Sequence, residues 1–203
     1  MRMATILLVL LPVASLAVYY LAFRGTAGQS PADSLGLPQA VYTCYPPGKR
    51  PQAYDFNLTD QYGERIALDQ LWNRPVLLTF TYTYCPDVCP LVNSLLNRTL
   101  PLLGGGVVAV DVTLDPQHDT VQRLAAYSKA NHYDWLFLTG PESYLEGIWK
   151  AYGVTRIAQQ NYIAHSIVFV VIYRGEVLGR VDGMPTSPEQ LASFVKTALA
   201  GCG

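Results

Sequence analysis

The chain has 203 residues, of which 50% are hydrophobic and 14% are charged, and its formal net charge at pH 7 is −1. It contains no basic block or stripe that would neutralise a phosphate backbone, so the composition argues against nucleic-acid binding. Its four cysteines are too few for a small scaffold held together by disulfides.

An uncharged apolar run at residues 3–23 lies between Arg2 and Arg24. A helix of that length, at 1.5 Å per residue, covers the roughly 30 Å hydrocarbon core of a membrane. The apolar region of a cleavable signal peptide is usually shorter, about 7–15 residues. We therefore predict a single transmembrane anchor at residues 1–24, with a cleaved signal peptide or a buried helix as alternatives.

Residues 25–50 are predicted to be a linker and an irregular lead-in, because Gly, Ser, Pro and Ala dominate the segment. Residues 51–203 are long enough for one domain with its own core. Cys44 and Cys202 flank the two ends of this domain. On the oxidising side of a membrane they either pair and tie the ends together or remain as two free thiols.

The domain alternates between strand and helix patterns. In chain order we predict a β-hairpin at residues 54–68 with a turn at 60–63, a short helical turn at 69–72, a strand at 76–82, a helix at 87–103 and a strand at 107–112. A helix beginning at Asp119-Thr120, a strand at 135–138, a helix at 142–152, strands at 167–173 and 177–181, and a helix at 188–199 follow. This order predicts an α/β domain with a mixed central sheet flanked by helices.

The most informative stretch is Cys85-Pro86-Asp87-Val88-Cys89-Pro90, directly after the buried strand at 76–82. Proline is tolerated in the first turn of a helix, so both cysteines are placed near a helix start. Residues four apart share one helix face, and the helix dipole favours thiolate over thiol there. The residues by themselves leave three interpretations open: a metal site, a redox dithiol or two structural thiols.

A strand that leads into a cysteine motif at a helix start resembles the thioredoxin-like arrangement, in which two residues usually separate the cysteines. Here three residues separate them. Thioredoxin-like domains also carry a cis-proline before the strand that faces the motif. In this chain His165 stands at or close to that position, before the strand at 167–173.

Four motifs together resemble the Sco/SenC family. They are the cysteine motif, Asp115-Pro116-Gln117-His118-Asp119-Thr120, Leu138-Thr139-Gly140 and His165-Ser166, in the order and spacing of that family. The resemblance implies a thioredoxin-like copper chaperone for the binuclear copper A site of cytochrome c oxidase subunit II. It implies copper ligands at Cys85, Cys89 and His165. Because a thiolate also attacks disulfides, we further predict that Cys85 and Cys89 form a redox-active disulfide.

The residue chemistry agrees with this implication. Thiolates select Cu(I), and imidazole is also a good Cu(II) ligand. A site with three protein ligands stays open to a ligand from a partner, whereas structural zinc requires four ligands in a closed tetrahedron. Taken alone, His165 would more often be a core histidine. His118 and His132 are predicted to be surface residues.

The chain departs from the family pattern at Ala164, where the family often has Asp before the histidine. That Asp would orient the imidazole through a hydrogen bond. Asp111, Asp115 or Asp119 are the candidates to replace it, and Asp87 and Asp119 are predicted as outer partners of the ligands. For these acids the alternatives are a helix-dipole role at Asp87 and loop shaping at Asp115 and Asp119.

Four aromatic residues, Tyr82, Tyr84, Trp135 and Trp149, are predicted to belong to the core and its rim, with Tyr84 exposed at a docking surface. The preferred hypothesis is a membrane-anchored metallochaperone rather than an enzyme, with its domain on the extracytoplasmic face. It would deliver copper to oxidase subunit II and also reduce the cysteines of that acceptor. The alternative is a membrane-tethered thiol–disulfide oxidoreductase.

Overall fold

The computed structural model describes residues 36, 39–160 and 162–202. The predicted membrane anchor and most of the predicted linker lie outside these residues. None of the helices in the described part of the chain has the length and hydrophobicity needed to cross a membrane.

The described residues build a central sheet of eight strands in the order β1-β10-β9-β4-β5-β6-β2-β3. The strands are β1 (Val41–Cys44), β2 (Asn57–Asp60), β3 (Arg65–Ala67), β4 (Val76–Thr81), β5 (Val108–Thr113), β6 (Leu136–Thr139), β9 (Val168–Tyr173) and β10 (Glu176–Asp182). β4, β5 and β6 run parallel, while β9 runs antiparallel to β4. The predicted mixed sheet is therefore confirmed.

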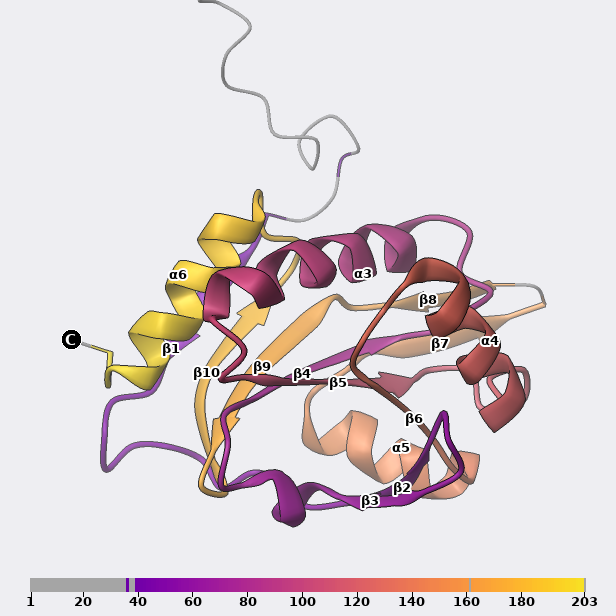
Figure 1. The fold of residues 1–203 in the computed structure, drawn as a ribbon, viewed down its shortest axis with the longest axis horizontal. Helices are drawn as coiled ribbons and strands as arrows, with labels where there is room; N and C mark the ends of the chain where they lie inside the picture. The colour runs from indigo at the N-terminus through magenta and orange to yellow at the C-terminus, as the bar shows by residue number, and fades with distance from the viewer. Residues whose placement is uncertain (1–35, 37–38, 161, 203) are drawn as a thin grey trace, which may run out of the picture. The chain divides into compact units, whose positions relative to one another are not determined.

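Helices cover both faces of this sheet: α3 (Val88–Thr99) and α6 (Pro188–Leu199) lie on one face and α5 (Glu142–Ala151) on the other, as Figure 1 shows. α4 (Val121–Asn131) follows β5, and two short 3-10 helices span Leu68–Leu71 and Leu100–Leu103. The core lies in the sheet, because every residue of β4 and five of the six residues of β9 are buried. Continuous apolar runs of this kind are expected in strands covered on both faces.

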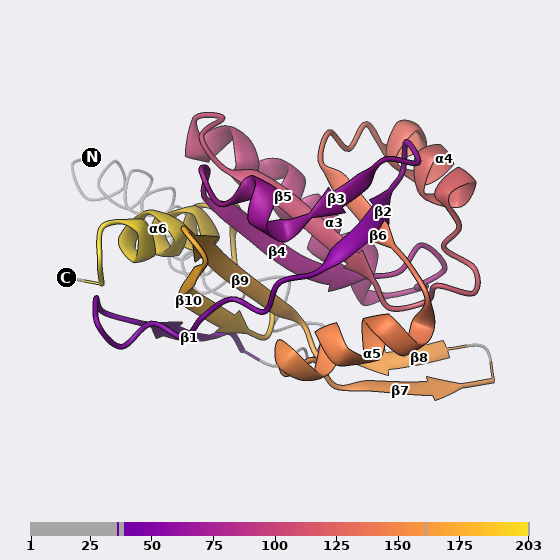
Figure 2. The same ribbon diagram turned by 90° about the horizontal axis from the view of Figure 1, so that it is seen from below.

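Two elements differ from the sequence prediction for local reasons. The helix predicted at 87–103 ends as an α-helix at Thr99, because Pro101 cannot occupy a helix interior. The remaining residues, Leu100–Leu103, form a 3-10 turn. Residues 41–44, assigned above to the linker and lead-in, form β1 along β10. A second, two-stranded sheet of β7 (Arg156–Gln159) and β8 (Tyr162–His165), unassigned in the sequence analysis, lies beside α5 in Figure 2.

Cys44 and Cys202 form a disulfide, which decides between the two alternatives left open by the sequence. The bond joins the end of β1 to the segment after α6, 158 residues further along the chain. It ties an edge strand to the carboxyl-terminal helix of the domain.

We expect replacement of both residues, Cys44→Ala with Cys202→Ala, to lower the free energy of unfolding by about 2–5 kcal/mol. The reason is that the cross-link closes a long loop and so restricts the unfolded chain. Urea unfolding monitored by circular dichroism measures the change. An unfolding midpoint equal to that of the parent chain would show that the disulfide adds no stability.

Candidate metal centre

The loop that carries the two cysteines is fixed at both ends. At its start, the Cys85 N–H donates to the Tyr82 carbonyl, 3.3 Å away. At its end, the Asp87 carboxylate accepts a hydrogen bond from the Val88 N–H and caps α3. Cys89 therefore lies in the first turn of α3, as the proline spacing predicts.

The two sulfurs face each other at this helix start. Both thiols are free, and both side chains are buried. The Cys89 N–H donates to the Cys85 sulfur at 3.3 Å, and the Cys85 sulfur lies 3.1 Å from the Asp87 Oδ1. An unpaired N–H of a helix start thus points at Cys85, which is the arrangement that stabilises a thiolate.

His165 approaches the sulfurs from β8. Its Nε2 lies 3.3 Å from the Cys89 sulfur, and its Nδ1 lies 3.0 Å from the Ser166 carbonyl oxygen. A carbonyl can only accept, so Nδ1 carries the proton of the neutral ring and the Nε2 lone pair faces the sulfurs. The Cys85 Sγ, the Cys89 Sγ and a ring nitrogen of His165 all lie within 4.8 Å of one another.

The surroundings of the two thiols shift their pKa values in opposite directions. Hydrogen bonding from Cys89, with a smaller contribution from the backbone of Asp87, lowers the pKa of Cys85 to about 5 although burial opposes the shift. Burial, and then the neighbouring Cys85, raises the pKa of Cys89. At neutral pH the metal-free pair therefore consists of one thiolate, Cys85, and one thiol, Cys89.

The acids near the site have different partners from one another. Asp87 reaches the site directly and also accepts a hydrogen bond from the Tyr162 hydroxyl at 3.1 Å. Asp119 instead accepts from Thr83 and from the Thr113 hydroxyl, so it shapes the loop before Cys85. Asp115 pairs with His118 at 2.8 Å.

None of these acids hydrogen-bonds His165 within the described residues, where the ring bonds only the Ser166 carbonyl and the Cys89 sulfur. The carboxylate that Ala164 does not supply is therefore not replaced by Asp111, Asp115 or Asp119.

His118 and His132 are both exposed, as predicted. Trp135 and Trp149 are buried, and Tyr84 is 58% exposed, which confirms their predicted places in the core and at its rim.

Asp111 of β5 has a raised pKa that the sequence pattern did not predict. It is buried, and it accepts hydrogen bonds from the Thr81 N–H and the Thr81 hydroxyl at 2.9 and 2.5 Å. Asn93 of α3, one helical turn after Cys89, donates to the same hydroxyl at 3.4 Å. Burial raises the pKa of Asp111 to about 7 although the bonds from Thr81 oppose the shift.

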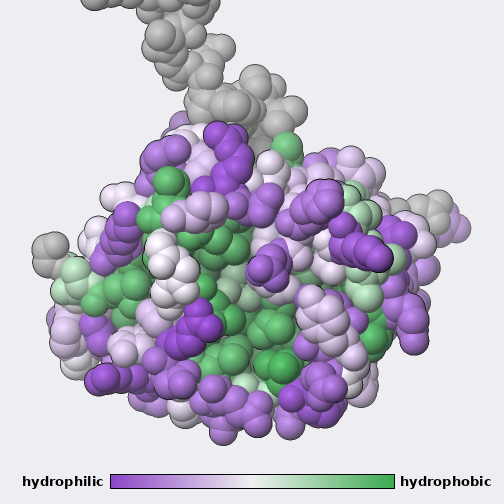
Figure 3. Space-filling model, viewed as in Figure 1, coloured by the Kyte–Doolittle hydropathy of each residue, from purple (hydrophilic) through white to green (hydrophobic). Residues whose placement is uncertain are grey.

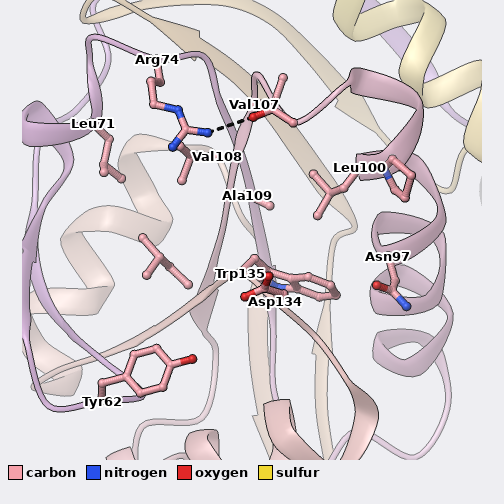
Figure 4. Close-up of a pocket in the computed structure, with 13 residues that line it drawn as sticks. Tyr62, Leu71, Arg74, Asn97, Leu100, Val107, Val108, Ala109, Asp134 and Trp135 are labelled. Atoms are coloured by element: carbon pink, nitrogen blue, oxygen red, sulfur yellow. Dashed lines mark hydrogen bonds between the residues drawn. The ribbon is translucent and has the colours of Figure 1, made fainter.

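Two cavities differ in their relation to the sulfurs. A cleft of about 540 Å³ lies beside the site, lined by residues that include Tyr82, Tyr84, Tyr162 and Ile163. A larger cavity of about 670 Å³ lies where β4, β5 and β6 begin, at the opposite edge of the sheet from the cysteine loop. Figure 4 shows this larger cavity, with Arg74 donating to the Gly105 carbonyl at its rim.

Figure 3, in the same view as Figure 1, shows apolar side chains gathered on this face of the molecule. Neither Cys85, Cys89 nor any histidine of the described residues lines the larger cavity.

Comparison with known proteins gives concordant matches. A family model described as SCO1/SenC matches residues 46–200. An SCO2-like protein of Rickettsia conorii is 32% identical over 153 residues, which cover 70% of this chain and 74% of that protein. Protein SCO1 homolog 1, mitochondrial, of Arabidopsis thaliana is 29% identical over 134 residues, which cover 62% of this chain and 40% of that protein.

Among solved structures, the crystal structure of Arabidopsis thaliana ScoI with copper bound matches with a TM-score of 0.66 at 25% identity. The match covers 74% of this chain and 99% of that chain. The central mixed sheet flanked by helices is thus the fold of that protein.

The raised pKa of Asp111 predicts a pH-dependent cost in stability. In the unfolded chain an Asp titrates near pH 3.9, so the folded state holds its proton more tightly between about pH 4 and 7. The protonated carboxyl of Asp111 carries no such cost below pH 4. As the pH rises from 4 through 7 the folded state loses stability, at roughly 1.4 kcal/mol per unit of pKa difference.

We therefore expect Asp111→Asn, which keeps an acceptor for the Thr81 N–H, to be more stable relative to the parent chain at pH 8 than at pH 5. Urea unfolding at the two pH values measures this difference, and other titrating groups cancel in the comparison. An equal difference at both pH values would contradict the buried, protonated carboxyl.

The lowered pKa of Cys85 predicts one thiolate per metal-free chain, titrating near pH 5, well below the ordinary thiol value of about 8.5. Ultraviolet thiolate absorbance measures it, and Cys44 and Cys202 do not contribute because they are paired. Cys89→Ala removes the main hydrogen bond to the thiolate, so we expect the midpoint to rise. A midpoint unchanged by this substitution would assign the low pKa to another cause.

Proposed function

The chain belongs to the SCO1/SenC family, and on that premise we propose that it is a copper-binding metallochaperone for cytochrome c oxidase. In this proposal it carries copper to the binuclear copper A site of oxidase subunit II. The single observation that carries the proposal is the convergence of the two sulfurs and the imidazole nitrogen within 4.8 Å. The copper-bound Arabidopsis ScoI supports it by its matching fold.

The donor set suits copper as a cargo. Two thiolates select Cu(I), and the imidazole extends the range to Cu(II). Cys85 is already a thiolate and the His165 Nε2 already presents a lone pair, so only Cys89 has to lose a proton when the ion binds. Cys85, Cys89 and His165 would hold the ion with a position left open.

An open position and an adjoining cleft allow ligand exchange. The cleft of about 540 Å³ shares its wall with the site, because Tyr82 and Ile163 line the cleft and Tyr82 packs against His165. A ligand of the acceptor would approach through this cleft and replace the protein ligands one at a time. The predicted anchor at residues 1–24 would keep the domain at the extracytoplasmic membrane surface, where the oxidase subunit receives its copper.

One observation favours a second activity, thiol–disulfide exchange. The thiolate of Cys85 is the form that attacks a disulfide, and Cys89 lies beside it to resolve the mixed disulfide. One such cycle leaves a Cys85–Cys89 disulfide in this chain and two thiols in the acceptor. The same reaction would prepare the cysteines of the acceptor for copper, or, with a reductant that regenerates the pair, would make the chain an oxidoreductase.

Titration with Cu(I) against a competing chelator tests the proposal. We expect one tightly bound ion per chain, abolished by Cys85→Ala or Cys89→Ala and weakened by His165→Ala. For the titration, His118→Ala is the matched control, because its side chain is 63% exposed and pairs with Asp115 and not with the sulfurs. A loaded chain should then transfer its copper to the metal-free copper-binding domain of subunit II.

The oxidoreductase predicts a different pattern. It would turn over protein disulfides at a rate that depends on both cysteines and tolerates His165→Ala. Turnover of that kind, together with failure to retain Cu(I), would contradict the metallochaperone.

A further inference from the structure

The β7–β8 hairpin that carries His165 stands apart from the central sheet (Figure 2). A two-stranded hairpin has marginal stability in water by itself. The distance between His165 and the sulfurs therefore depends on the contacts that join this hairpin to the cysteine loop.

One buried side chain makes two of these contacts. The Tyr82 hydroxyl donates to the Ile163 carbonyl at 3.3 Å and accepts from the Ile163 N–H at 3.2 Å. Ile163 precedes His165 by two residues in β8, so their side chains lie on the same face of the strand. Fixing the Ile163 backbone thus fixes where the imidazole points.

Tyr82 also contacts the ligand and its loop directly. Its ring meets the His165 ring edge-on, with 5.9 Å between the centroids, and its carbonyl accepts from the Cys85 N–H. The side chain is 4% exposed, so water does not readily replace these bonds. Tyr82 therefore contacts both the cysteine loop and the histidine strand from a buried position.

The other attachments of the hairpin do not reach both the cysteine loop and the ligand strand through a buried group. In β7, Arg156 stands opposite His165 and donates to the Leu114 carbonyl at 2.6 Å, which ties the hairpin to the segment after β5. At the base, Thr155 and Ser166 exchange hydrogen bonds of 3.0 and 3.1 Å, which close the hairpin on itself. At the tip, the Tyr162 hydroxyl donates to Asp87 in an exposed position. The bond from the His165 Nδ1 to the Ser166 carbonyl orients the ring on its own strand and does not reach the sulfurs.

We propose that Tyr82 is a positioning residue whose hydroxyl holds the His165 strand against the cysteine loop and so sets the copper affinity of the site. This inference rests on the proposed function. It assigns to a phenol the orienting role for which Ala164 provides no carboxylate.

A double-mutant cycle tests it. Tyr82→Phe removes the hydroxyl, keeps the ring, and leaves two backbone groups of Ile163 unpaired. We expect it to weaken Cu(I) binding about 10- to 100-fold, the range found when outer partners of metal ligands are lost. In a His165→Ala background the same substitution should change the affinity less than about threefold, because its effect is transmitted through the imidazole.

Tyr152→Phe is the matched control. Tyr152 is also 4% exposed and donates its hydroxyl to a backbone carbonyl, that of Tyr54, at 2.8 Å. It lies outside the site, so we expect it to lower stability without changing copper affinity. An equal loss of affinity from Tyr82→Phe in both backgrounds, or no loss in the parent chain, would overturn the proposal.

Amide hydrogen exchange separates this inference from the proposed function, because it needs no copper. In the metal-free chain we expect Tyr82→Phe to accelerate exchange at Ile163 at least tenfold, and Tyr152→Phe to leave it unchanged. Unchanged protection at Ile163 in Tyr82→Phe would overturn the positioning role whether or not the parent chain binds copper. Failure of the parent chain to bind Cu(I), with faster exchange at Ile163, would reject the proposed function and retain the hairpin attachment.

Discussion

The contact between the Cys89 sulfur and the His165 imidazole joins two segments 76 residues apart, and the site depends on it. The sheet makes this contact possible. β4 and β9 are antiparallel neighbours, with Thr79 opposite Phe169, so the end of β4 and the start of β9 lie at the same edge. The loop that leaves β4 carries the cysteines, and the segment that enters β9 carries the histidine.

The polar groups behind the sulfurs explain why the two thiols differ. A helix start directs an N–H at Cys85, whereas Cys89 is buried, and the neighbouring Cys85 and Asp111 add to the rise in its pKa. Burial therefore keeps Cys89 protonated until a cation or a disulfide replaces its proton. One thiolate and one thiol are suited to accept a soft cation with the release of a single proton.

The second pair of cysteines lies at the other end of the strands. Through β10 and β9, Cys44 stands level with Leu77 near the start of β4, whereas Cys85 follows the end of that strand. The separation lets the chain keep a structural disulfide and a free dithiol at the same time.

The sequence by itself determined what depends on neighbours along the chain. The apolar run at 76–82, the prolines after each cysteine and the three-residue spacing placed Cys85 and Cys89 at a helix start, and helix physics then favoured a thiolate. The sequence resemblance, and not the local pattern, singled out His165.

Only the tertiary structure decided which acids meet the ligands, that Cys44 and Cys202 pair, and that a short hairpin after α5 delivers the imidazole. Its strands of four residues are too short to show a periodic pattern. Tyr82 shows both kinds of information. Its place at the end of a buried strand predicted that it would be buried. Its bonds to Ile163 join residues 81 positions apart, so they form only once the sheet has brought the two segments together.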